Sequence, residues 1–375
     1  MKIVMFYHTL VSDWNHGNAH FLRGVASELI RRGHDVVVFE PSDSWSRLNL
    51  IDQFGDDPLK RFHEAYPDLE ANVYRSEDFD PEVAVKDADL VIVHEWNRHE
   101  LVARLGEIRR NHDFTLLFHD THHRMVTEPG AMAAYDLSGY DGVLAFGEVL
   151  RDLYLSKRLA KRAWTWHEAA DTRIFHPLPD IPRNDGDLVW IGNWGDDERE
   201  AELHEFLIEP VRQLGLKACV YGVRYPEHAL HALRRAGIEY KGWLPNFQVP
   251  YVFARYRVTV HVPRQAYVRA LPGIPTIRPF EAMACGIPLV SAPWQDAEHL
   301  FSPGNDFLFA TNGQEMKEKL SGIIGDEEGA KRISARGLET IRRRHTCSHR
   351  VDELLQIHDE LGSRHGRKPS RHILS

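Results

Sequence analysis

The sequence predicts an α/β protein made of two doubly wound parallel sheets. In each half of the chain, short apolar runs rich in β-branched residues alternate with amphipathic helical patterns. Continuous apolar strands are typical of parallel sheets that helices cover on both faces. Alternation of strand and helix leads to right-handed crossovers and a doubly wound topology. We expect two such domains, facing each other across a central cleft.

The first half of the chain begins directly with an apolar strand. The helix that follows has Phe21, Leu22 and Val25 on one face, and Gly33 ends it. The predicted elements are strand Ile3–Tyr7, helix Ala19–Arg32, and strands Asp35–Glu40, Leu90–His94, Thr115–His119 and Gly142–Phe146.

The same pattern starts again near Asp187. Three prolines between Phe175 and Arg183 indicate a linker, so we place a boundary between residues 165 and 185, with domains at 1–165 and 166–346. The predicted strands are Leu188–Ile191, Ala218–Tyr221, Glu239–Tyr240, Val258–Val262 and Ile287–Ser291. The predicted helices are Arg199–Gln213, Pro226–Ala236, Val249–Ala254, Arg278–Cys285 and Gly313–Ile324, with further helical segments in Arg332–Leu361. The polar and basic tail 363–375 is expected to be disordered.

Composition excludes several classes of protein. Apolar residues make up 43% and charged residues 27% of the 375 residues, as in soluble globular proteins. The net charge of −9 argues against a broad nucleic-acid surface. The sequence contains no run of about 18 apolar residues, so we expect no transmembrane helix. Three scattered cysteines are typical of reduced thiols. We expect a cytoplasmic protein, and leave peripheral attachment to the inner membrane open.

The segment Arg278–Trp294 carries the strongest functional pattern. A helix begins after a loop rich in Gly and Pro, ends at Gly286, and leads at once into a buried strand. A helix N-terminus offers free N–H groups and a positive dipole end, which favour phosphate. The carboxylate of Glu281, expected in the first turn, suits ribose hydroxyls, although an isolated Glu could simply stabilise the helix. Arg278 could bind a diphosphate or pair with Glu281. The pattern indicates a nucleotide-sugar site.

Four segments together resemble the GT-B glycosyltransferases, in particular the group-1 (GT4-like) branch and its shorter CgeB-like relatives. They are Thr115–His119, Glu168–Pro177, Arg278–Trp294, and His345–Arg350 with the helical residues after it. The resemblance implies a GT-B fold with an N-terminal acceptor domain and a C-terminal donor domain. It also implies that a helix at 347–362 crosses back to the N-terminal domain.

The resemblance implies roles for individual residues. The donor-binding candidates are Gly17, Gly192, Asn193, Gly222, Trp243, Arg269, Gly273, Arg278 and Glu281; the catalytic candidates are His119, Asp120 and His16. Two departures stand out. The family's first Glu is replaced by Gly273, and the usual Arg and Lys that hold the diphosphate are missing after Gly192. Trp243 could equally be a core residue, and the loop around His16 an ordinary strand-to-helix connection.

The implied activity is transfer of a sugar from a nucleotide-diphosphate sugar to an acceptor hydroxyl, without a metal or other cofactor. The run His119–Arg124 could suggest a metal site, but we favour a donor-sugar contact by His119 and predict no metal site.

The donor is expected to be a UDP-sugar first and a GDP-sugar second. Retention of configuration is favoured weakly over inversion. A glycan, a lipid-linked sugar, a small metabolite or a modified base would all be compatible acceptors, and the oligomeric state is open. The alternatives are a non-catalytic sugar-nucleotide-binding module and an epimerase of the same fold.

Overall fold

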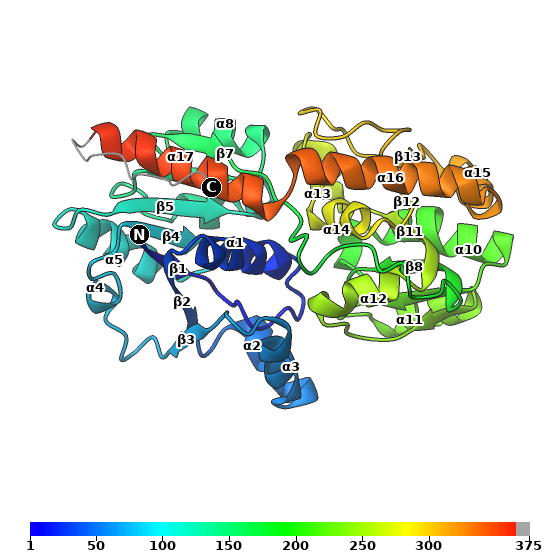
Figure 1. Cartoon of the computed structure of the whole chain (residues 1–375), viewed down its shortest axis with the longest axis horizontal. Coiled ribbons are helices and arrows are strands. Elements are labelled where there is room, and N and C mark those ends of the chain that lie inside the picture. Colours follow the sequence, from blue (N-terminus) through cyan, green and yellow to red (C-terminus); the bar gives the residue numbers. More distant parts are fainter. Residues whose placement is uncertain (365–375) are drawn as a thin grey trace. The chain divides into compact units, whose positions relative to one another are not determined.

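Strands and helices alternate along the computed structural model, which describes residues 1–364. The chain divides into two units (Figure 1). The first unit holds Met1–Ser12, Leu22–Glu168 and the residues from Cys347 onward. The second unit holds Asp13–Phe21 and Ala169–Thr346. The predicted tail 363–375 lies outside the described residues except for its first two positions, which end the last helix.

The first unit is built on a seven-stranded parallel sheet with strand order β3-β2-β1-β4-β5-β6-β7. Its strands are β1 (Lys2–Phe6), β2 (Asp35–Pro41), β3 (Ala71–Tyr74), β4 (Leu90–His94), β5 (Thr115–Asp120), β6 (Gly142–Ala145) and β7 (Ala163–Thr165). Its helices are α1 (Ala19–Arg31, whose first three residues belong to the second unit), α2 (Trp45–Phe54), α3 (Asp57–Ala65), α4 (Pro81–Ala84), α5 (His99–Arg109), α6 (Arg124–Thr127), α7 (Pro129–Ala133), α8 (Glu148–Ser156) and α17 (Cys347–Arg364). The central strands β4 and β5 are buried along their whole length.

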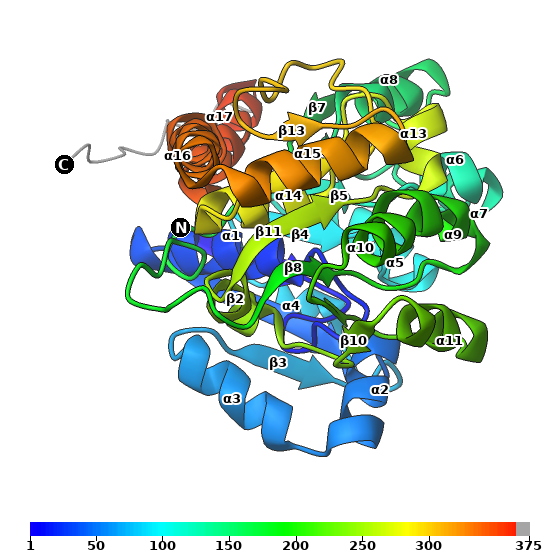
Figure 2. The same ribbon diagram turned by 90° about the vertical axis from the view of Figure 1, so that its right-hand side faces the viewer.

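The second unit is built on a six-stranded parallel sheet with strand order β10-β9-β8-β11-β12-β13 (Figure 2). Its strands are β8 (Gly186–Ile191), β9 (Ala218–Tyr221), β10 (Ile238–Tyr240), β11 (Tyr256–His261), β12 (Leu289–Ser291) and β13 (Leu308–Phe309). Its helices are α9 (Glu200–Leu203), α10 (Glu209–Leu214), α11 (Glu227–Arg235), α12 (Val249–Phe253), α13 (Gln265–Ala270), α14 (Ile277–Cys285), α15 (Gly313–Gly325) and α16 (Glu327–Arg344), with single turns η1 (Asp196–Glu198), η2 (His204–Ile208) and η3 (Asn246–Gln248).

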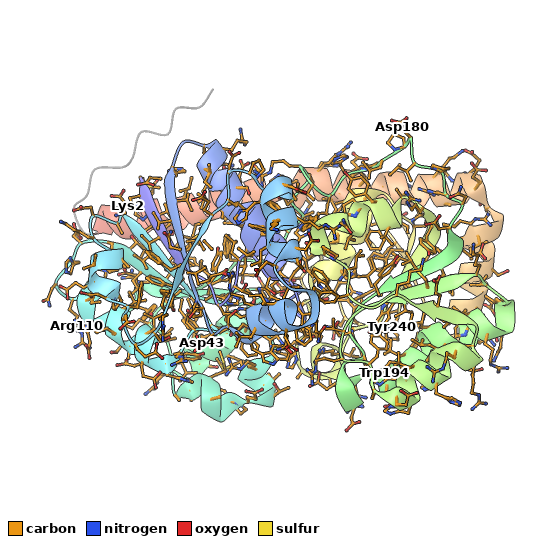
Figure 3. All side chains as sticks on the ribbon, turned by 90° about the horizontal axis from the view of Figure 1, so that it is seen from below. Lys2, Asp43, Arg110, Asp180, Trp194 and Tyr240 are labelled. Carbon is orange, nitrogen blue, oxygen red and sulfur yellow. The ribbon has the colours of Figure 1, made fainter. Side chains whose placement is uncertain are left out.

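These two parallel sheets confirm the predicted fold class. In both, the first strand has the second strand on one side and a later strand on the other, so the strand order reverses between β1 and β4 and between β8 and β11. Ligands of doubly wound folds bind at such reversals, beyond the carboxyl ends of the strands. Side chains fill the space between each sheet and its helices, and Trp194 of the second unit is almost fully buried (Figure 3).

Two predicted helices differ from the structure. The helix expected over Arg199–Gln213 is divided into α9, the wide π turn η2 and α10. Pro210 accounts for this, because it has no N–H to donate and its ring crowds the carbonyl one turn earlier. The helical pattern at Arg332–Leu361 is two helices, α16 and α17, separated where Ala170 N–H donates to the His345 carbonyl.

The last helix, α17, is held to the first unit by hydrogen bonds between residues far apart in sequence. Trp166 Nε1 donates to the Arg350 carbonyl at 2.8 Å, and Arg350 Nε donates to the His167 carbonyl at 2.9 Å. Arg32 of the first unit pairs with Asp352 at 2.6 Å. The chain therefore returns to the first unit after completing the second.

Candidate functional site

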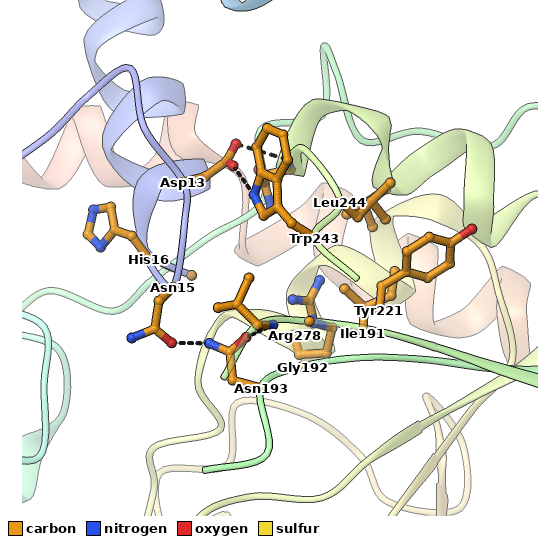
Figure 4. A pocket seen from close by; sticks show the side chains of 15 residues that line it. Asp13, Asn15, His16, Ile191, Gly192, Asn193, Tyr221, Trp243, Leu244 and Arg278 are labelled. Atoms are coloured by element: carbon orange, nitrogen blue, oxygen red, sulfur yellow. Dashed lines mark hydrogen bonds between the residues drawn. The ribbon is translucent and has the colours of Figure 1, made fainter. Parts of the chain in front are cut away.

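A pocket of about 480 Å³, which includes space open to solvent, lies at the carboxyl ends of β8, β9 and β10 in the second unit (Figure 4). The turns after these strands supply most of its wall, and the segment before α1 and the start of α14 complete it. The lining residues are Asp13, Asn15, His16, Gly17, Ile191, Gly192, Asn193, Tyr221, Gly222, Val223, Trp243, Leu244, Asn246, Val249 and Arg278. The pocket is therefore next to the reversal of strand order, where this fold binds ligands.

Two glycines let the turns after β8 and β9 approach closely. A Cβ atom on Gly222 would lie 2.1 Å from the Gly192 carbonyl oxygen, so only glycine fits at position 222. Tyr225 donates its hydroxyl to the same oxygen at 2.7 Å, and Val223 N–H donates to the Asn193 side chain at 2.9 Å. Backbone at this part of the pocket is consequently bare of side chains, as phosphate-binding turns require.

The segment before α1 closes one side of the pocket through Asp13. One carboxylate oxygen of Asp13 accepts from Trp243 Nε1 at 3.1 Å, and the other accepts from Asn246 N–H at 2.9 Å (Figure 4). Asn193 Nδ2 donates to Asn15 Oδ1. Asp13 is the one acidic residue among those that line the pocket within the described chain.

Glu281 lies behind the pocket wall rather than on it. The side chain has 0% exposure, and its carboxylate contacts Arg278 Nη1, Asn246 Nδ2 at 2.7 Å and His20 Nδ1 at 3.1 Å. Burial alone would raise the pKa of this carboxyl group, but the Arg278 charge and the bonds from His20 and Asn246 outweigh it and lower the pKa. Because α14 begins at Ile277, Glu281 is its fifth residue, and the expected place in the first turn was wrong.

Arg199 is a cation of the site that the sequence prediction missed. Its guanidinium donates to the carbonyls of Asn193 and, at 3.0 Å, of Val262, so it ties the turn after β8 to the end of β11. Burial, followed by the charge of Arg264, lowers its pKa to about 9. A signal was present in the sequence, since Arg199 is the first basic residue after Gly192. Its bonds hold the pocket's backbone in place.

His261, at the end of β11, is a second residue that the sequence did not single out. It is 3% exposed, and its Nδ1 lies 2.9 Å from Ser291 Oγ. Its Nε2 has no hydrogen-bond partner within residues 1–364. Burial lowers its pKa to about 3, and the charges of Arg199 and Arg278 act in the same direction. A neutral imidazole therefore stands beside two guanidinium groups at the reversal of strand order.

Besides Glu281, two of the predicted donor residues do not line the pocket. Arg269 is exposed on α13. Gly273 has a φ of +92° and packs against Glu298, whose Oε1 would lie 2.5 Å from a Cβ atom at that position. Gly273 is thus required by its backbone conformation and by the neighbouring side chain. Their predicted contacts with a donor stay predictions.

The three predicted catalytic residues fall into different units. His16 is 8% exposed and lines the pocket of the second unit. His119 and Asp120 end β5 of the first unit, and both have 0% exposure. The His119 ring lies edge-on to Trp166, with centroids 4.7 Å apart, and burial lowers its pKa to about 3. An enclosed, neutral imidazole at this place can pack or donate, and its role in catalysis stays a prediction.

Asp120 forms a buried acid pair with Glu95, which the sequence prediction missed although Glu95 directly follows a predicted strand. Asp120 Oδ2 accepts from the Tyr154 hydroxyl at 2.8 Å, and Glu95 Oε1 accepts from Thr121 N–H at 3.0 Å. Burial raises the pKa of Asp120 to about 6. Burial, followed by the charge of Asp120, raises the pKa of Glu95 well above its usual value.

This acid pair predicts a pH-dependent stability. The folded-state pKa of Asp120 lies above its unfolded value, so its contribution is present at low pH and is lost as the pH rises through about 6. Between pH 4 and pH 7, Asp120→Asn should therefore lose less stability than the wild type, with a difference of at most about 3 kcal/mol. Urea unfolding at several pH values measures it. Asp52→Asn, at an exposed carboxylate of α2, is the matched control and should follow the wild type; parallel curves for all three proteins would contradict the prediction.

Neither a metal cluster nor a membrane span is found in the part of the chain that the structure describes. No group of three or more His, Cys, Asp and Glu side chains there could hold a metal ion. None of the described helices is both long enough and apolar enough to cross a membrane. All three cysteines are buried, and none of them forms a disulfide within residues 1–364.

Comparison with known proteins supports the fold and part of the sequence interpretation. The family model described as "Glycosyl transferase-like" matches residues 199–356, less than half of the chain. A search of curated proteins found no match. The matched residues include α14, Arg199 and most of the pocket turns.

Three solved structures share the fold at low sequence identity. Sucrose-phosphate synthase from Thermosynechococcus elongatus has a TM-score of 0.68 and 14% identity, with 97% of this chain and 99% of that chain covered. HepE from Anabaena, in complex with UDP and glucose, has a TM-score of 0.66 and 15% identity, with 95% and 99% covered. An α-glucosyltransferase in complex with UDP and a 13-mer DNA has a TM-score of 0.65 and 12% identity, with 96% and 99% covered. The chain therefore has the GT-B glycosyltransferase fold, and its residues 199–356 match the glycosyl transferase-like family.

Proposed function

We propose that this chain is a glycosyltransferase that moves a sugar from a nucleotide-diphosphate sugar to an acceptor hydroxyl. The observation that carries the proposal is the pocket at the carboxyl ends of β8, β9 and β10, with bare glycine turns on one side and Arg278 on another. This combination suits a diphosphate, because backbone N–H groups and a guanidinium both stabilise phosphate oxygens. The family match over residues 199–356 supports the same activity.

We propose a UDP-sugar as the donor. UDP is present in the complexes of HepE and of the α-glucosyltransferase, which share the fold. In this chain Trp243 lines the pocket and offers an aromatic surface to a base, with its indole N–H held by Asp13. A GDP-sugar is the second candidate. The resemblance to CgeB-like enzymes, a cytoplasmic location and the domain bounds 1–165, 166–346 and 347–362 belong to the same proposal.

The chemistry that we propose needs no metal. As the bond between the sugar's C1 and the diphosphate oxygen breaks, negative charge grows on the departing diphosphate. Arg278 and the N–H groups of the glycine turns stabilise that charge from fixed positions. A bond forms between C1 and the acceptor oxygen, and the departing phosphate takes the hydroxyl proton. Configuration is retained in this scheme, which the full burial of Asp120 supports, since an enclosed carboxylate cannot reach an acceptor.

The acceptor class is open within this proposal. The α-glucosyltransferase with the same fold was solved with DNA, whereas HepE was solved with glucose. The net charge of −9 favours an acceptor other than a polyanion. A glycan, a lipid-linked sugar or a small metabolite fits that charge better than duplex DNA.

Arg278→Met tests the proposal at the pocket. Loss of a charged hydrogen-bond donor should weaken UDP binding by about 1.5–3 kcal/mol, and uridine binding much less, because uridine has no phosphate. Calorimetry with UDP, GDP and uridine measures both effects. Arg255→Met is the matched control, since Arg255 is half exposed before β11, outside the pocket lining, and pairs with Asp185.

Nucleotide release from UDP-glucose then separates an enzyme from a binding module. Slow release of UDP, with faster release when an acceptor is added, would support a transferase. Tight UDP binding without any turnover over a broad set of acceptors would support the non-catalytic module. Absence of UDP and GDP binding by the wild-type chain would refute the proposal.

A further inference from the structure

A chain of buried polar groups runs from the backbone at Asp171 to the pocket wall. Asp171 N–H lies 2.7 Å from His20 Nε2, and His20 Nδ1 lies 3.1 Å from Glu281 Oε1. His20 and Glu281 both have 0% exposure, and neither lines the pocket. All of these residues belong to the second unit. His20 can therefore act on a ligand only through its neighbours.

The first of these contacts fixes the protonation of the imidazole. A backbone N–H can only donate, so Nε2 of His20 must be the unprotonated, accepting nitrogen. The ring is therefore neutral and carries its hydrogen on Nδ1, the atom that lies against Glu281. The ring of Phe175 packs on the imidazole with centroids 3.9 Å apart, which holds the ring in this orientation. His20 consequently faces Glu281 Oε1 with its Nδ1 hydrogen, at an Nδ1–Oε1 distance of 3.1 Å.

The Glu281 carboxylate links His20 to two residues that line the pocket. Its Oε1 also accepts from Asn246 Nδ2 at 2.7 Å, and its Oε2 pairs with Arg278 Nη1. Asn246 and Arg278 both line the pocket, although Glu281 and His20 do not. A glutamate carboxylate can rotate about its Cγ–Cδ bond unless both of its oxygens are engaged. The groups that contact the two oxygens therefore fix the orientation of the carboxylate, and with it the positions of Arg278 and Asn246.

We infer that His20 is a positioning residue of the donor pocket: it locks the Glu281 carboxylate, which aims Arg278 and Asn246 at the ligand. The inference rests on the proposed function. It also explains why residues 13–21 group with the second unit, because His20 contacts that unit on two sides. A displacement of about 1 Å at a catalytic cation can lower turnover by about 100-fold, so a buried residue can matter this much without touching substrate.

The test uses two substitutions that each keep one of the two contacts. Asparagine at position 20 places its amide nitrogen near the site of Nδ1 and can still donate to Glu281. Glutamine reaches the site of Nε2 and can still accept from Asp171, but leaves Glu281 without this donor. We expect His20→Gln to lower the kcat for UDP release from UDP-glucose by about 10- to 100-fold and His20→Asn to stay within about 5-fold of wild type.

Controls separate this role from a packing role. His345→Leu removes another buried imidazole of the second unit, one that contacts the Leu300 carbonyl at 2.9 Å, and should lower the melting temperature with little change in kcat. In the wild-type chain, nitrogen NMR of His20 should show the proton on Nδ1, a readout that needs no substrate.

The outcomes are distinct. A deficit in the glutamine variant that the asparagine variant rescues, together with a proton on Nδ1, supports the inference. Equal kcat in both variants, or a proton on Nε2, overturns it while the proposed function stands. A wild-type chain that neither binds UDP nor releases it from UDP-glucose overturns the proposed function, and with it the role assigned to His20.

Discussion

Alanine at position 281 is expected to lower the free energy of unfolding by about 3–5 kcal/mol, the usual effect of removing one partner of a buried ion pair. Glu281 has 0% exposure and is the carboxylate against which Arg278 is placed. Its loss leaves a guanidinium of only 17% exposure without that partner, and takes an acceptor from Asn246 and from His20. Urea unfolding measures the loss.

The neighbouring substitutions sharpen this test. Glu281→Gln keeps an acceptor oxygen and should lose less than alanine does. The double variant Glu281→Gln with Arg278→Met should lose less than the sum of its two single variants, because no uncompensated charge is left behind. Glu227→Ala breaks an exposed pair with Arg234 and should change stability by no more than about 1 kcal/mol. If Glu281→Ala behaved like Glu227→Ala, the buried network would carry no stability.

Glu281→Gln also separates two roles for this carboxylate. A ribose contact by Glu281, as the family resemblance implies, requires the side chain to reach the ligand. The structure instead shows the carboxylate engaged by three protein groups behind the wall. Both roles predict weaker UDP binding, by about 1–3 kcal/mol. Only the ribose role predicts that 2′-deoxy-UDP loses no further affinity in the variant, so calorimetry with both nucleotides distinguishes them.

Alanine at position 222 is expected to have the second large effect. Its methyl group would lie 2.1 Å from the Gly192 carbonyl oxygen, and backbone cannot move aside as a flexible side chain would. The turns after β8 and β9 must therefore separate, at about 1–3 kcal/mol in stability. Since both glycines line the pocket, UDP affinity should fall together with stability.

The control for Gly222→Ala is a glycine with open space around it. Gly322 lies exposed within α15, with no neighbouring atom within 4 Å of the place that a methyl group would take. Alanine there should raise stability by about 0.5–1 kcal/mol. Thermal unfolding and UDP calorimetry on both variants measure the contrast. Wild-type UDP affinity in Gly222→Ala would show that the close approach of these turns does not shape the site.

Most of the sheet cores could be predicted from sequence, together with the edge strand β10, whereas the other three edge strands could not. Strands β1, β4 and β5 are continuous apolar runs because they are buried on both faces. The edge strands β3, β7 and β13 were missed. The residues of all three are partly or largely exposed, so nothing requires an apolar run there. A search for continuous apolar runs therefore finds buried strands more readily than exposed ones.

The residues of the pocket also divide into those that could be predicted from sequence and those that could not. Gly192, Gly222 and Trp243 follow predicted strands, so their place at the carboxyl end of a sheet follows from sequence. Arg269 was chosen for its charge and its loop, but the turn of α13 places it in solvent. The sequence analysis did not single out Glu95, because a single acid near the end of a strand has no pattern of its own.

Local sequence patterns were enough to predict the two parallel sheets, the residues of their central strands and the glycine turns that face the pocket, because each depends on local periodicity and on backbone conformation. Three features could be seen only in the folded chain: Glu281 is enclosed, Asp120 shares its site with Glu95, and residues 13–21 belong with the second unit. Those facts depend on contacts between residues far apart in the chain. Burial and charge pairing are properties of such contacts, and no local pattern of residues encodes them.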